Sequence, residues 1–472
     1  MTTTSKATKS TKKGTTKGQK KATPATIKKS SKPDRLTLRS YQVGFGDCYL
    51  LTFHYGSVGR HVLIDFGSTG LPPDLHKDQM LRVAQDIRKQ CGGDQAKLHV
   101  VVATHRHKDH ISGFATNKDG DASGDIIRQC NPDVVIQPWT EDPKAKTDAT
   151  KATLTPSGKS IAFTDTLLDM HRVAAAVRAE GIELLRFSPH RALASQLAFL
   201  GEDNLSNLSA VKNLMEMGKP DKQNKARRAL YVNYDFDNPL DLSRELPGVT
   251  VRVLGPPTLV QSDKIAKMRS KDAAEFWQLQ ASAGKSQVDE NTFLFSEVAT
   301  KSASQLTPPY TRWFIRRMDA ARGNQLLGLV RVLDSVMNNT SVILLFEAGD
   351  KKLLFPGDAQ IENWNYALEE AEKNPQLKQL LQEVDVYKVG HHGSRNANPK
   401  SLWEMFGKRD TKDSPERLKT FVSTMSGKHG DPKKHTEVPR KSLVDALKKL
   451  SNYFTTQKIE DDELSQSVTI DL

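Results

Sequence analysis

The chain has 472 residues, of which 37% are hydrophobic and 26% are charged, and this suits one large elaborated domain or two small ones. It has no run of about 18 apolar residues and no apolar stretch among residues 1–34, so we expect neither a membrane span nor a secretory signal. Its three cysteines lack CxxC spacing, which argues against a disulfide framework or a cysteine zinc site and favours a reducing, cytoplasmic location.

Residues 1–34 carry ten lysines and one acid, so this segment supplies +9 of the net charge of +13. Its Thr, Lys, Ser, Ala and Gly residues cannot bury enough apolar surface to offset chain entropy, and we expect a disordered tail. Such tails bind polyanions through counterion release, which makes DNA an expected partner; a solubilising leader is the alternative. The paired lysines of the tail are Lys12, Lys13, Lys20, Lys21, Lys28 and Lys29.

Residues 35–472 are expected to form one domain of the α/β (α+β) class, in which helices wrap sheets. Its first part combines strands with one amphipathic helix and a short apolar run typical of a strand covered on both faces. These elements span residues 36–42, 48–54, 61–64, 77–89 (the helix) and 98–103.

The middle of the chain, at about 142–337, is predicted to be a large, mostly helical insertion interrupted by a core strand near 249–254. Its amphipathic helices would suit a lid, a protein partner or an oligomer surface. The later predicted elements are strands at 341–346, 352–355, 384–389 and 418–424 and a helix at 442–450.

A metal-ligand pattern directly follows the strand at 98–103. In an extended loop His105 and His107 point the same way and can share one ion, whereas Asp109 and His110 follow as the chain turns and can face a second ion. Imidazole and carboxylate ligands suit zinc, manganese or iron, and not calcium or magnesium. Three histidines and one aspartate within six residues therefore predict a metal site.

Further ligands are expected from the ends of other strands. Asp358 ends a strand that runs into a turn, and His391 and His392 follow a strand that ends in a glycine. Alone, a strand-end aspartate is more often a turn cap. Beside the histidine-rich loop, however, the combination predicts a two-metal site.

Five short motifs accompany these residues: 43–48 (VGFGDC), 63–67 (LIDFG), 339–342 (NTSV), 355–358 (FPGD) and 388–394 (KVGHHGS). With the HxHxDH pattern they resemble the metallo-β-lactamase fold hydrolases, and most closely the hydrolase domain of ComEC-type DNA-uptake competence proteins. The resemblance covers roughly residues 36–114, 248–258 and 338–472. It implies a metallo-β-lactamase αββα sandwich with metals at the edge between two sheets, in a relative that lacks the membrane part.

By this resemblance the site would hold two divalent metal ions, zinc or manganese. His105 and His107 would bind the first ion, and Asp109 and His110 would bind the second. Asp358 would bridge both ions, and the two aspartates would be catalytic.

A further histidine would complete the second site. His391 is favoured because it directly follows the strand and its glycine, and His392, oriented toward substrate, is the alternative. Many family members place another histidine on the first metal, but this chain has none from residue 191 to 390. The first ion would then be held more weakly, or completed by water or a substrate oxygen, with Asn339 in that neighbourhood.

Several polar residues are expected around the ligands. Asp47 and Asp65 would hold the ligand loop by hydrogen bonds, and Ser394 and Arg395 could contact a substrate phosphate. Two loop histidines near the C-terminus could add a general acid or a phosphate contact, unless they are ordinary exposed residues. They are His429 and His435.

Together these features predict a metal-dependent hydrolase, and first a nuclease or phosphodiesterase that cleaves DNA through a two-metal-activated hydroxide. The lysine tail would raise the local concentration of DNA. Two alternatives stay open: a small-molecule phosphodiesterase or lactonase, and a non-catalytic interaction or sensor protein that uses the insertion as its partner surface.

Overall fold

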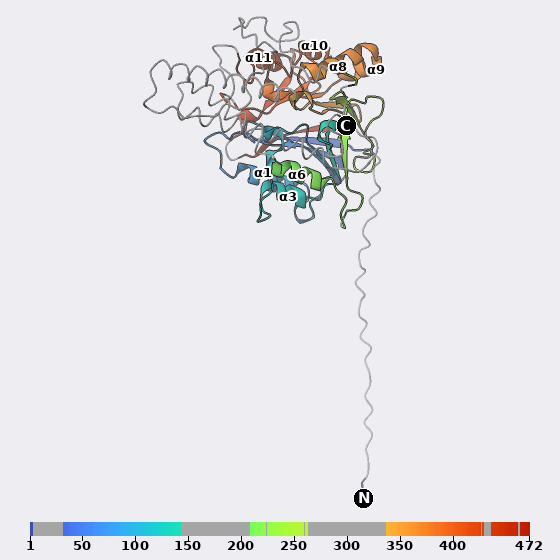
Figure 1. Cartoon of the computed structure of the whole chain (residues 1–472), viewed down its shortest axis with the longest axis vertical. Coiled ribbons are helices and arrows are strands. Elements are labelled where there is room, and N and C mark those ends of the chain that lie inside the picture. Colours follow the sequence, from blue (N-terminus) through green and yellow to red (C-terminus); the bar gives the residue numbers. More distant parts are fainter. Residues whose placement is uncertain are drawn as a thin grey trace, which may run out of the picture.

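The computed structural model describes residues 1–2, 32–142, 208–222, 224–258, 260–262, 337–425, 427–428, 436–460 and 463–472 (Figure 1). The lysine tail, most of the predicted insertion, and His429 and His435 lie outside the described residues.

A mixed sheet of seven described strands runs in the order β13-β1-β2-β3-β4-β5-β6. Neighbours from β13 to β3 are antiparallel, and those from β3 to β6 are parallel. The strands are β1 (Arg35–Tyr41), β2 (Cys48–Tyr55), β3 (Val58–Phe66), β4 (Val100–Val102), β5 (Val134–Pro138), β6 (Arg228–Val232) and β13 (Ser465–Asp471).

A second mixed sheet has six described strands in the order β12-β11-β10-β9-β8-β7. Here β7, β8 and β9 are antiparallel neighbours, and β9 to β12 are parallel. The strands are β7 (Val249–Gly255), β8 (Ile343–Ala348), β9 (Lys351–Phe355), β10 (Val386–Lys388), β11 (Lys419–Val422) and β12 (Asn452–Thr455).

Helices cover the outer face of each sheet, and Figure 1 shows the two groups on opposite sides of the molecule. The first sheet packs against α1 (Gln79–Gln90), α3 (Ser123–Gln129) and α6 (Leu208–Met217). The second sheet packs against α8 (Ile361–Lys373), α9 (Pro375–Gln382), α10 (Lys400–Met405) and α11 (Lys441–Leu450). The mixed α/β class predicted from the sequence is confirmed.

Apolar side chains between the sheets form the central core. Leu51 and Val102 from the first sheet belong to the same buried cluster as Leu344 and Phe355 from the second sheet. Removing such a side chain from water contributes about 1.5–3 kcal/mol each. The two sheets are therefore held face to face, and the loops at their shared edge have fixed positions.

Part of the predicted insertion belongs to these layers. The strand expected near 249–254 is β7, as predicted, but α6 and β6 also lie in this region and join the first sheet and its helix layer. Residues 208–258 therefore contribute more to the core than one strand. The expected helices at 143–207 and 263–336 fall outside the described residues.

Two glycines allow the loops at the site edge to pack closely. A Cβ on Gly67, which follows β3, would lie 2.4 Å from the backbone nitrogen of His110. A Cβ on Gly357, which follows β9 and has a φ of 56°, would lie 2.7 Å from the Thr104 side chain. Glycine at both positions lets the ends of β3, β4 and β9 meet.

Candidate metal centre

The loop after β4 is fixed by an aspartate at the end of β3. The backbone nitrogen and the hydroxyl of Thr104 each donate a 2.8 Å hydrogen bond to the Asp65 carboxylate. His105 and His107 follow, and the short helix α2 (Lys108–Ile111) begins directly after His107. Asp65 therefore anchors the start of the ligand loop through these two hydrogen bonds.

Two groups of buried ligand atoms that share Asp109 converge at this edge, beside a third group of Asp47, Asp65 and His110. One contains His105, His107 and Asp109, and the other contains Asp109 and His110 with two distant residues; within each group the ligand atoms lie within 4.8 Å of one another. The distant members of the second group are Asp358 and His392. Asp109 is the member that the two groups share, whereas the family resemblance gives the bridging role to Asp358.

Short distances define the second group. His392 Nε2 lies 2.9 Å from Asp109 Oδ2, and His110 Nε2 lies 3.0 Å from Asp358 Oδ2. Asp109 and Asp358 are separated by 249 positions in the chain but face the same small space. The sequence-predicted meeting of the HxHxDH loop with Asp358 and the histidine pair is therefore present in the structure.

His392, and not the favoured His391, lies in the converging group. The His392 side chain is fully buried, and its Nδ1 lies 2.8 Å from the carbonyl oxygen of Ser423 after β11. His391 is 27% exposed, and its Nε2 is 3.7 Å from Asp358 Oδ2. Both residues have a positive φ. In the turn after Gly390 the imidazole of His392, and not that of His391, points toward Asp109.

Several ligand atoms have no hydrogen-bond partner among the described residues. These buried atoms are Asp109 Oδ1, His110 Nε2 and Asp358 Oδ2. His110 Nε2 and Asp358 Oδ2 lie 3.0 Å apart, but their orientation does not fit a hydrogen bond. Unsatisfied buried polar atoms are costly, and a cation would satisfy all three. The donor set of imidazole nitrogens and carboxylate oxygens fits zinc, manganese or iron. These buried groups could therefore hold metal ions.

The outer nitrogens of two histidines are held by protein acceptors. His110 Nδ1 lies 2.8 Å from Asp65 Oδ2, so its Nε2 is directed at Asp358. His392 Nδ1 is held in the same way by the Ser423 carbonyl and its Nε2 faces Asp109. Carboxylate or carbonyl acceptors behind a histidine are the usual support of a metal ligand.

Asn338, and not Asn339, lies beside the first group. Asn338 Oδ1 is 3.0 Å from His107 Nδ1, whereas Asn339 Nδ2 donates to Glu362 Oε2 at 3.1 Å. An asparagine does lie in this neighbourhood, but it is Asn338 and not the expected Asn339. Neighbouring residues after a helical turn point in different directions, and this is not visible in the sequence.

Lys388 is a site residue that the sequence analysis missed. It is buried on β10, where its Nζ contacts the Asp47 carboxylate, donates to the Gly357 carbonyl at 3.0 Å and lies 3.5 Å from Asp358 Oδ1. The backbone nitrogen of His391 donates to the same Asp358 oxygen at 3.0 Å. Oδ1 is therefore held by the protein, and Oδ2 faces His110. In the sequence, Lys388 stands out as a charged residue at the end of an otherwise apolar strand, and this pattern could have identified it.

The charges of these groups are mutually dependent. Burial disfavours the Asp109 carboxylate, but the neighbouring His110 and His392 outweigh that effect and hold the pKa of Asp109 well below its usual range. Burial also opposes the charge on Lys388, yet Asp47 and Asp358 raise its pKa. The Asp109 carboxylate is thus ionised at neutral pH.

The imidazole of His105 is neutral. Burial and the neighbouring His110 and His107 hold the pKa of His105 well below its ordinary value. A neutral imidazole presents the lone pair that a metal ion needs. The residue is therefore in the protonation state of a ligand without any rearrangement.

The two expected phosphate contacts lie just beyond the histidine pair. Ser394 is buried, and its backbone nitrogen donates to the His391 carbonyl at 2.8 Å. Burial and the nearby Arg440 lower the pKa of Arg395. A phosphate role for Ser394 and Arg395 stays a prediction.

A comparison of the chain with protein-family models and with curated proteins gives no match. Within the described residues no helix combines the length and the apolar character needed to cross a membrane.

Proposed function

We propose that the protein is a metal-dependent phosphodiesterase that cleaves DNA, built on a sandwich of the metallo-β-lactamase type. The observation that carries this proposal is the meeting of buried histidines and aspartates from the ends of β4, β9 and β10. The alternation of helix, sheet, sheet and helix layers and the position of the ligands at the sheet edge support the same family resemblance.

The residues of the site divide into ligands and positioning groups. His105 and His107 with Asp109 would hold one ion, and Asp109 and His110 with Asp358 would hold another, completed by His392. Divalent ions at such a site supply Lewis acidity and bring the pKa of a bound water near 7. The protein holds His110, His392 and Asp358 in place through the groups behind them, so that these ligands need not reorient when substrate arrives.

The charge of the buried cluster favours an anionic substrate. The cluster holds four carboxylates, from Asp47, Asp65, Asp109 and Asp358, and one ammonium, from Lys388, which lies beside Asp47 and Asp358. With bound ions keeping the histidines neutral, the protein groups carry a net charge of −3. One divalent ion would leave −1, which repels a phosphodiester, whereas two would leave +1. Two divalent ions therefore leave a positive charge at the site, and this charge attracts an anionic phosphodiester.

Hydrolysis by matched variants tests this proposal. We expect the unaltered chain with zinc or manganese to degrade DNA, and D109N and D358N to lose at least a hundredfold in rate. Asp385→Asn is the control, because Asp385 is a buried aspartate at the opposite end of β10, where it pairs with Lys408. A small chromogenic phosphodiester and a lactone assayed alongside separate nuclease activity from small-molecule hydrolysis. Equal activity of D358N and D385N would exclude the proposed centre.

A further inference from the structure

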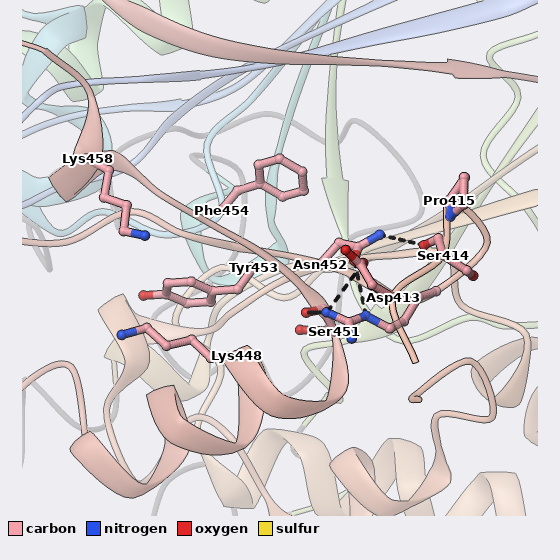
Figure 2. Close-up of a pocket in the computed structure, with 10 residues that line it drawn as sticks. Asp413, Ser414, Pro415, Lys448, Ser451, Asn452, Tyr453, Phe454 and Lys458 are labelled. Atoms are coloured by element: carbon pink, nitrogen blue, oxygen red, sulfur yellow. Dashed lines mark hydrogen bonds and ion pairs between the residues drawn. The ribbon is translucent and has the colours of Figure 1, made fainter. Parts of the chain in front are cut away.

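A groove with a volume of about 660 Å³ lies along β12, the edge strand of the second sheet, and no part of it is used by the metal centre. Figure 2 shows the side chains that surround it. Those that decide its chemistry are Asp413, Arg417, Lys448, Tyr453, Phe454 and Lys458.

The groove is positively charged. Lys448 at the end of α11 and Lys458 after β12 are both exposed, and neither forms an ion pair within the part of the chain that the structure describes. Arg417 is buried and donates to the Asn452 side chain at 3.0 Å. One carboxylate, the exposed Asp413, lies 3.9 Å from Arg417. Three cations against one carboxylate make the groove attractive to anions.

Two aromatic residues line the groove, and the ring of Tyr453 lies between Lys448 and Lys458 (Figure 2). Tyr453 is half-buried, and Lys448 Nζ is 5.8 Å from its ring centroid; in Figure 2 both lysines extend beside this ring. Phe454, also half-buried, stacks on Phe421 with ring centroids 4.7 Å apart. Aromatic faces flanked by cations are the arrangement on which single-stranded nucleic acids stack their bases and neutralise their phosphates.

One end of the groove reaches the edge of the sheet where the metal centre lies. Lys458 is two residues beyond Thr456, whose hydroxyl accepts a 3.1 Å hydrogen bond from the backbone nitrogen of Thr424. Thr424 follows Ser423, whose carbonyl oxygen holds His392. A strand bound along β12 would thus run from the far end of the sheet toward the candidate metal ions.

We propose that this groove binds a single-stranded nucleic acid and directs it to the metal centre. Phosphates would lie against Lys448 and Lys458, and a base would stack on Tyr453. Charge complementarity and the half-buried ring of Tyr453 favour this occupant over a protein strand added to the edge of β12. The direction toward the metal centre rests on the proposed function, but binding in the groove does not.

Binding of a fluorescent oligothymidylate to the full chain tests the electrostatic part. A phosphorothioate backbone keeps the charge of each linkage and resists hydrolysis, so the chain can be used as purified. We expect the double variant K448A/K458A to weaken binding about tenfold at physiological salt and to reduce the salt slope by about 1.4, since each phosphate contact contributes about 0.7. The control K441A/K449A removes two exposed lysines of the same helix that do not line the groove, and should leave the slope unchanged.

Substitution of the ring tests the stacking part. Y453L should lose about tenfold in affinity for the single strand, whereas Y453F should retain it, because stacking uses the ring and not the hydroxyl. Neither should alter binding of a duplex of the same length, whose bases are paired. Thermal unfolding and metal content of each variant check that the fold is kept.

Three results would overturn the proposal. The first is unchanged binding by K448A/K458A, and the second is an equal loss of affinity in the control K441A/K449A. The third is displacement of the oligonucleotide by polyglutamate when Y453L has no effect. That third result would indicate a surface for acidic proteins. Failure of the proposed hydrolase function is seen separately, as an absence of hydrolysis by the unaltered chain with metal.

Discussion

At the scale of single residues, the candidate centre depends on one buried ammonium among four carboxylates. Lys388 holds one oxygen of Asp358 and contacts Asp47, so it sets both the charge of the cluster and the direction of a ligand oxygen. Its position at the end of β10, three residues before His391, places it between the two sheets. Replacing Lys388 should therefore lower the stability of the metal-free protein more than that of the metal-bound protein.

Lys388→Met is expected to destabilise the metal-free protein by about 3–5 kcal/mol, because it leaves buried carboxylates without their cation. Added zinc or manganese should restore part of the loss, since the ions supply the missing positive charge. Lys352→Met is the control: Lys352 Nζ lies 2.9 Å from the partly exposed Glu383 carboxylate, and its loss should cost about 1 kcal/mol or less. Denaturant unfolding with chelator and with metal measures both; equal losses in chelator would contradict this role.

The two adjacent histidines should differ in their effect on metal binding. His392→Ala removes an imidazole that lies 2.9 Å from Asp109 and should weaken metal binding at least tenfold. His391→Ala removes a partly exposed ring outside the ligand group and should have a smaller effect. Competition with a chromogenic chelator compares them, and a larger loss in the His391 variant would reverse the assignment.

At the scale of elements, most strands with apolar runs were predicted, but β5, which begins with three apolar residues, was not. β4 and β10 follow from short runs of Val and other apolar residues. β13 alternates polar and apolar residues only weakly and pairs with β1, more than 400 residues away, so no local pattern indicates it. β12 was also missed, although its partner β11 lies nearby in the chain.

The same limit applies to the site. The ligand loop at 105–110 and Asp358 could be predicted because each follows the end of a strand, although β4 and β9 belong to different sheets that meet at this edge. The choice of His392 depends on the Ser423 carbonyl, which a third strand supplies, and spacing within the motif does not encode it. Asn338 and Lys388 are likewise defined only by contacts across the sheets.

The close approach of β3 to the ligand loop gives a prediction for an element. Gly67→Ala would place a Cβ 2.4 Å from the His110 nitrogen, so α2 must shift. We expect a loss of about 1–3 kcal/mol in stability together with weaker metal binding. Gly56→Ala is the control for metal binding, since no atom lies within 4 Å of the added Cβ, although its φ of 65° adds a backbone strain that Gly67 does not have. Calorimetric titration with zinc would contradict the account if both variants bound metal alike.

At the scale of the whole molecule, acid should destabilise the first sheet through two buried histidines away from the metal centre. Burial lowers the pKa of His61 to about 4 and that of His99 to about 3, and the backbone nitrogen of His61 donates to His99 Nδ1 at 3.0 Å. Both residues are neutral in the folded state. In the unfolded chain their pKa is about 6.5.

The free energy of unfolding should therefore be fully retained above about pH 6.5 and fall as the pH decreases below it, by about 1.4 kcal/mol per pH unit for each histidine. Between about pH 6.5 and pH 5 this amounts to roughly 2 kcal/mol per histidine. His99→Asn keeps an acceptor for the His61 nitrogen. It should remove the part of the decrease in the free energy of unfolding that His99 causes. Denaturant unfolding at both pH values measures it; an identical loss in the variant would contradict this origin of acid sensitivity.

The number of divalent ions bound per chain tests the central claim most directly. Elemental mass spectrometry of protein purified without chelator, then equilibrated with zinc or manganese, should give about two ions per chain. D109N should lose most of both, because Asp109 belongs to both groups of ligand atoms, while the control D385N should keep two. A chain that binds no divalent ion, or a D109N variant that binds as many as D385N, would contradict the account.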